Sequence, residues 1–96
     1  MERLLADFEE FCQTPGVDSG KARSYAKAIA YLCEYLNITV IDAASIAYMK
    51  STENDIKDKN SALYKDLLVF LSARGQKSYL TKGWIRAGLK HFFDFV

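Results

Sequence analysis

The stretch from Thr81 to Val96 constrains the fold most, because as a helix it would be apolar on nearly all sides. Its apolar residues recur at helical spacing on two adjoining stripes: Ile85, Leu89, Phe92 and Val96, beside Trp84, Gly88 and Phe95. A helix of this kind is normally enclosed by other elements. We therefore expect a central helix. Thr81 is its expected N-cap, since the hydroxyl can accept a hydrogen bond from a free backbone N–H of the first turn.

One strip of this helix is polar. Lys82, Arg86 and Lys90 follow one another at i, i+4 and i+8, so they share a face, and no acidic residue stands between them. Ala87 and Gly88 have a methyl group or no side chain, so a neighbouring backbone can come close there. The sequence thus predicts a mostly buried helix with one basic edge.

Two amphipathic helices are predicted in the first part of the chain. The first spans Glu2 to Gln13, and Thr14-Pro15-Gly16 ends it because proline cannot continue the hydrogen-bond ladder. The second spans Ser19 to Leu36, with Asp18 or Ser19 as its cap and Asn37 at its end. Apolar residues follow a seven-residue repeat on this second helix: Ala22, Tyr25, Ala26, Ile29, Leu32, Cys33 and Leu36.

Shorter elements are predicted in the second part. The segment from Ile38 to Ile41 is β-branched, but no other segment could pair with it as a strand, so an extended linker is expected. Asp42 caps a short helix through Met49, and residues 51–60 have room for another helical turn around Ile56. A further helix is expected from Ser61 to Ala73. Its core face would comprise Leu63, Tyr64, Leu67, Leu68 and Leu71, widened by Val69 and Phe70.

Together these elements predict an all-α protein, a compact bundle of four or five helices around the central C-terminal helix. The 96 residues fit a single helical domain, 1–96. No stretch approaches the roughly 20 apolar residues of a membrane span, so no membrane partner is expected. Acids begin at Glu2 and no apolar run follows, which is unlike a signal peptide. We expect a cytoplasmic protein.

The distribution of charge is more informative than its total. The formal net charge is only +1, which gives no bulk argument for nucleic acid. The segment from Glu2 to Asp18 is net acidic, whereas the charged residues from Arg74 to Lys90 are all basic, as are Lys21, Arg23 and Lys27. A molecule polarised in this way can orient on an anionic surface despite its neutral total.

The sequence contains no recognisable catalytic or metal-binding constellation, and no cofactor is expected. His91, the single histidine, lies between core aromatics and is expected to be a packed or surface side chain. Cys12 and Cys33 fall on apolar helix faces, as reduced core thiols do. No acid pair or glycine-rich phosphate loop is present. Trp84 with Tyr79 could form a stacking platform for a base, although a tryptophan at this spacing is more often part of a core.

Two stretches resemble a known family. The run from Gly16 to Tyr25, continuing to Tyr35-Leu36, is similar to the opening helix of the SAM-like core-binding domain of tyrosine recombinases, the phage integrases. Ser78-x-x-Thr81, followed by the run from Gly88 to Phe95, is similar to the closing helix of that domain. The chain also resembles the helical N-terminal regions of some bacterial HNH-type restriction endonucleases, where an aromatic-rich Leu-Lys-His helix closes the region.

These resemblances imply a non-catalytic DNA-binding module, N-terminal to a recombinase or restriction-nuclease domain in a larger protein. In the integrases the first and last long helices of the domain clamp double-stranded DNA. Here the basic helix edges would contact the phosphate backbone, an interaction that fixes position without reading sequence. The expected DNA-binding residues are Lys21, Arg23, Lys27, Lys77, Lys82, Arg86 and Lys90.

A second function stays open. The acidic first helix and the aromatic end from Phe92 to Val96 would also suit a protein-interaction or oligomerisation module, in a homodimer or against an adjoining catalytic domain. Ionic strength separates the two hypotheses, because phosphate binding weakens steeply with salt whereas apolar association does not.

Overall fold

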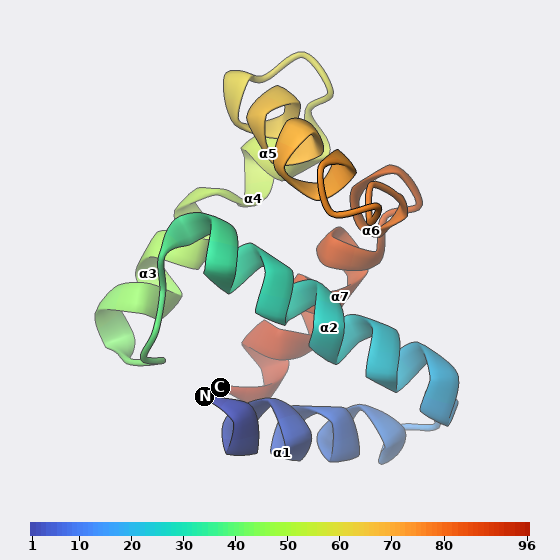
Figure 1. Ribbon diagram of the computed structural model, residues 1–96. Coiled ribbons are helices and arrows are strands. Elements are labelled where there is room, and N and C mark those ends of the chain that lie inside the picture. The colour runs from blue at the N-terminus through green and yellow to red at the C-terminus, as the bar shows by residue number, and fades with distance from the viewer.

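The computed structural model describes all 96 residues and contains helices joined by short connections, without a strand (Figure 1). The predicted all-α bundle is confirmed. Two very short helices, α4 and α6, separate the longer ones. The elements are α1 (Glu2–Gln13), α2 (Ser19–Leu36), α3 (Ala43–Ser51), α4 (Glu53–Lys57), α5 (Ala62–Ser72), α6 (Ser78–Thr81) and α7 (Trp84–Phe95). None of these helices has the length and hydropathy that a membrane crossing would require.

Local side-chain chemistry fixes several helix ends. The Asp18 carboxylate accepts a hydrogen bond from the backbone N–H of Lys21 at 2.9 Å and caps α2. Asn37 ends α2 in the left-handed region, with φ of 58°. Asp42 and Ser45 bond reciprocally to one another's backbone N–H groups in a capping box at the start of α3. The predicted bounds of α1 and α2 and the cap of α3 are therefore confirmed.

Helix α7 is central, as predicted. It contacts α1, α2, α4 and α6, and its Ile85, Leu89 and Phe92 are fully buried (Figure 1). Helices α7 and α2 come close at Gly88, where a Cβ atom would lie 3.3 Å from the backbone oxygen of Tyr25 on α2. The core is one cluster of 19 buried residues, with members on every helix from α1 to α7.

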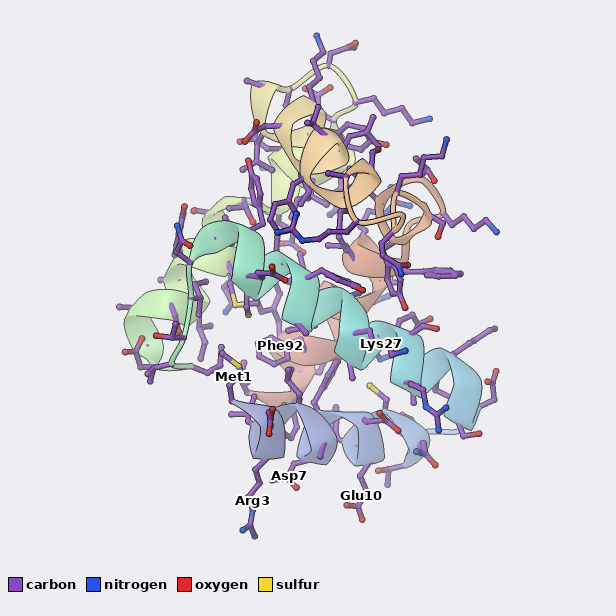
Figure 2. All side chains as sticks on the ribbon, viewed as in Figure 1. Met1, Arg3, Asp7, Glu10, Lys27 and Phe92 are labelled. Carbon is purple, nitrogen blue, oxygen red and sulfur yellow. The ribbon has the colours of Figure 1, made fainter.

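The aromatic end of α7 packs against α1. The ring of Phe92 lies between α1 and α2 (Figure 2), 5.2 Å from the ring of Phe8 in an edge-to-face contact. The ring of Phe95 lies 5.6 Å from Phe8 and 5.3 Å from Phe11. On the other side of α1, three charged side chains point away from α2: Arg3, Asp7 and Glu10. Much of the apolar C-terminal run is thus covered within the chain.

The predicted cap of the last helix is wrong. Thr81 does not cap α7, because residues 78–81 form the separate turn α6. The chain then passes through Gly83, whose φ of 77° lies in the left-handed region, and α7 begins only at Trp84. A glycine tolerates this conformation at little cost, so it can end one helix and start the next.

One residue on α5 that was predicted to lie in the core is also found at the surface. Val69 is 69% exposed, because it lies on the outer side of the helix, away from the buried Leu67 and Leu71. Phe70 is half-buried, as part of a junction with α2. There the Arg74 guanidinium lies 3.6 Å from the Phe70 ring centroid, and the Tyr35 hydroxyl donates to Asp66 at 2.7 Å. Burial of the Tyr35 hydroxyl, and to a smaller extent its hydrogen bond to Asp66, raise the pKa of Tyr35 to about 12.

Candidate functional site

The basic edge of α7 lines a cleft shared with α4. Two adjoining hollows, of about 210 and 570 Å³, have Lys57, Lys82, Gly83 and Arg86 in common. We call them together the α4–α7 cleft. Their other lining residues are Ile56, Lys59, Tyr64, Leu80 and Thr81 in the smaller hollow, and Glu53, Ala87 and Lys90 in the larger. The cleft therefore has five cationic side chains against a single carboxylate, that of Glu53.

Burial of one isoleucine holds α4 at the cleft. Ile56 is only 3% exposed and belongs to the core, so the next residue, Lys57, is carried to the rim. Lys59 lies in the turn that follows α4, and hydrogen bonds stabilise this turn. In this turn the Asn60 N–H donates to the Asp58 carboxylate at 2.9 Å, and the Ser61 hydroxyl donates to the Asp55 carbonyl at 2.8 Å.

The α6–α7 turn forms the floor of the cleft. Gly83 lines both hollows, and its N–H donates to the Leu80 carbonyl at 3.1 Å. No side chain caps the N-terminus of α7. The first N–H groups of a helix have no partner within it, and the helix dipole is positive there. The backbone thus adds to the positive potential that the side chains produce.

None of the cations of the cleft forms a salt bridge. All five are exposed, and the one salt bridge in the structure lies elsewhere, between Arg74 and Glu34 at 3.1 Å. Unpaired cations facing one hollow repel one another, and an anion bound among them would relieve that repulsion. The cleft is suited to a polyanion with several phosphate or carboxylate groups.

The structure unites some of the predicted DNA-binding residues and separates others. Lys82, Arg86 and Lys90 all line the cleft, but only Arg86 and Lys90 lie on α7 at the predicted i, i+4 spacing, because Lys82 precedes that helix. Glu53 of α4 lies among them. Lys77 and Arg23 are exposed and line neither hollow of the cleft.

The other two predicted residues line separate depressions. Lys27 lies on α2 (Figure 2), in a groove with Glu2 and Glu9 of α1, so acids surround it. Lys21 lines a hollow beside Trp84. The basic residues of α2 therefore do not extend the α4–α7 cleft as one continuous surface.

Lys57 and Lys59 were not predicted to be binding residues from the sequence. Both lie in a segment of mixed charge, where no basic periodicity marks them. The available signal was Ile56, a lone apolar residue in a polar segment, which indicates a buried anchor with exposed neighbours. Even so, no local pattern in the sequence reveals which helices bury the Ile56 side chain.

A third hollow, which we call the Trp84 hollow, lies between α2 and the start of α7. Its volume is about 390 Å³, and it is lined by Asp18, Gly20, Lys21, Ser24, Tyr25 and Trp84. Trp84 is half-buried and meets the buried Tyr79 edge-to-face, with centroids 4.9 Å apart. Tyr79 is thus part of the core, and of this pair only Trp84 reaches the hollow. His91, which was predicted to be a packed or surface side chain, packs on Tyr25 with 5.2 Å between the ring centroids and 24° between the rings.

The remaining reactive groups lie in the core. Cys12 and Cys33 are buried and unpaired, as predicted, and burial raises the pKa of the Cys33 thiol to about 11. No three side chains of the histidine, cysteine, aspartate and glutamate types lie close enough together to hold a metal ion. The most distinctive chemical feature is therefore the cationic cleft.

Comparison with known proteins finds no matching family model, no similar curated protein and no similar solved structure.

Proposed function

We propose that this chain is a non-catalytic DNA-binding module that holds the phosphate backbone of double-stranded DNA in the α4–α7 cleft. The observation that carries the proposal is the set of five unpaired cations around one cleft: Lys57, Lys59, Lys82, Arg86 and Lys90. Lysine and arginine contacts to phosphate oxygens fix a protein's position on a duplex without reading its sequence.

In this proposal, both walls of the cleft contact the DNA backbone. Arg86 and Lys90 follow the axis of α7 at an interval of about 6 Å, the rise of four helical residues, and Lys82 lies just before this helix. Lys57 at the end of α4 and Lys59 in the turn after it line the other wall. A DNA strand in the cleft would be contacted from both sides, with the uncapped N-terminus of α7 as an additional donor to phosphate.

The proposed biological setting follows from the resemblance to integrase core-binding domains and restriction-enzyme N-terminal regions. In this setting the module precedes a recombinase or nuclease domain that supplies the chemistry, and it acts in the cytoplasm. The acidic outer side of α1 would face away from DNA, since Asp7 and Glu10 point away from the rest of the bundle (Figure 2).

The packing at the C-terminal end gives less support to the interaction-module hypothesis. Phe92 is fully buried, and Phe95 is held against Phe8 and Phe11. Val96 is 43% exposed and Phe93 is half-buried, which leaves a small apolar surface for a partner. An oligomerisation module would be expected to expose a larger one.

The test is the affinity for duplex DNA at several salt concentrations, measured for the parent and for the Lys82→Ala/Arg86→Ala/Lys90→Ala variant. We expect the parent to bind at low salt. If each of the three residues contacts one phosphate, the salt slope of the triple variant is smaller by about three units. The stability cost should be within about 0.5 kcal/mol per site, because the residues are exposed.

A charge-matched control removes three exposed cations outside the cleft: Arg3, Lys50 and Lys65. Both triple variants contain one arginine and two lysine replacements, and both change the net charge from +1 to −2. The control should keep most of the affinity and nearly the parent slope. Equal losses in the two variants would indicate that only total charge matters, and no binding by the parent at low salt would refute the proposal.

A further inference from the structure

We propose that the Trp84 hollow receives an unpaired nucleobase, so that the module favours DNA with a single-stranded segment over fully paired duplex. This inference rests on the proposed function, since it concerns DNA whose backbone occupies the α4–α7 cleft. It adds a contact to a base, which the cationic cleft by itself does not provide.

Two aromatic side chains line the hollow and suit it to the flat ring of a nucleobase. Trp84 and Tyr25 both line it, and both are half-buried, which holds them in place while leaving part of each ring accessible. Tyr25 is supported by the parallel ring of His91, and Trp84 by the edge-to-face contact with Tyr79. No aromatic ring of the protein stacks in parallel on Trp84. A base can stack on such a side chain whatever its identity, because every base has a π-face.

The polar groups of the hollow favour a base over a phosphate. Asp18 and Lys21 contribute opposite charges, and the Asp18 carboxylate is fixed by its bond to the Lys21 N–H at 2.9 Å. A phosphate there would meet a carboxylate that cannot easily move away. A neutral base would not be repelled, and the Ser24 hydroxyl could pair with its polar edge.

Lys82 connects this hollow with the cleft. Its side chain lines both hollows of the cleft, and its Nζ atom lies 5.8 Å from the centroid of the Trp84 ring. One nucleotide could therefore place its phosphate at Lys82 and its base against Trp84. In a paired duplex the bases are stacked inside, so the same backbone position would leave the hollow empty. This difference is the physical origin of the expected preference.

The experiment uses the emission of Trp84, the only tryptophan in the chain. Three labelled ligands of equal length are compared: an oligothymidylate, an abasic oligomer with the same phosphates, and a blunt duplex. Anisotropy reports binding and tryptophan emission reports stacking. We expect oligothymidylate to quench the emission at saturation, and neither the abasic oligomer nor the duplex to do so. Trp84→Leu should weaken oligothymidylate binding about tenfold and duplex binding by less than about twofold.

Two further variants make the test specific. Tyr25→Leu keeps Trp84 as the fluorescent reporter and should reduce the quenching by oligothymidylate. Tyr48→Leu removes a 48% exposed tyrosine on α3 and should change neither the quenching nor the binding. If Trp84→Leu does not fold, the emission of the parent protein with oligothymidylate and with the abasic oligomer shows whether a base stacks on Trp84. Equal emission with these two ligands overturns the inference while duplex binding still supports the proposed function. Absence of binding to all three at low salt overturns both.

Discussion

Gly88 is a residue at which the backbones of α7 and α2 come close. A Cβ atom there would meet the Tyr25 carbonyl oxygen at 3.3 Å and the Tyr25 Cα at 3.5 Å, both of them backbone atoms that cannot rotate away. Elsewhere in a helix interior, alanine is more stable than glycine by about 1 kcal/mol. At Gly88 the crowding opposes this gain, because the two helices would have to move apart.

We therefore predict that Gly88→Ala lowers the free energy of unfolding, by on the order of 1 kcal/mol after both effects are counted. Urea denaturation followed by circular dichroism measures the change. Gly88→Ser places a larger group at the same contact and should destabilise further. A more stable Gly88→Ala protein would mean that the contact between α2 and α7 is looser than described.

At the scale of an element, the amphipathic pattern identifies most buried faces but not their edges. Leu32 on α2 and Leu89 on α7 were predicted to be buried, and both have no exposed surface. Val69 on α5 fits the same kind of apolar stripe in sequence, yet it is 69% exposed. A branched apolar residue beside a core stripe can lie just outside the contact area of a short helix.

This difference gives a prediction with an internal control. Leu32→Ala and Leu89→Ala should each lower the free energy of unfolding by about 2–5 kcal/mol, as truncation of buried leucines does. Val69→Ala should change it by no more than about 0.5 kcal/mol, as surface substitutions do. Chemical denaturation of the three variants under one set of conditions provides the comparison. A large loss for Val69→Ala would place that side chain in the core after all.

Over the whole molecule, the outer acids of α1 lie outside the α4–α7 cleft. The outer acids of α1, Asp7 and Glu10, lie at one end of the bundle, whereas α4 and α6 lie at the other (Figures 1 and 2). The molecule measures 34 × 28 × 21 Å, and the Debye length is only about 10 Å at 0.1 M salt. Charges at the α1 end are therefore largely screened from a ligand in the α4–α7 cleft at physiological ionic strength.

We predict that Asp7→Asn with Glu10→Gln changes duplex affinity by less than about twofold near 0.15 M salt. At about 0.01 M salt, where the Debye length is about 30 Å, the same variant should bind more tightly than the parent. Glu53→Gln, which removes the carboxylate inside the cleft, should increase affinity at both salt concentrations. A fluorescence anisotropy titration provides all the values, and a large effect of the α1 variant at 0.15 M would place DNA nearer to α1.

The sequence by itself determined the class of the fold and most of its elements. Periodic apolar residues predicted α1, α2, α5 and α7, and capping residues marked the end of α2 at Asn37 and the start of α3 at Asp42, because these signals act within one or two helical turns. The start of α7 was misjudged because the left-handed conformation of Gly83 divides one apolar stretch into two helices. A glycine permits that conformation but does not require it.

The candidate site could be predicted only in part. The spacing of Arg86 and Lys90 on α7, with Lys82 just before that helix, is a local property, so the basic edge was visible in the sequence. Lys57 and Lys59 join it only because Ile56 is buried and α4 packs on α5 and α7, and Trp84 and Tyr25 line one hollow only because Gly88 lets α2 approach. These contacts join residues far apart in the chain. They depend on how helix faces fit together, which the tertiary structure alone decides.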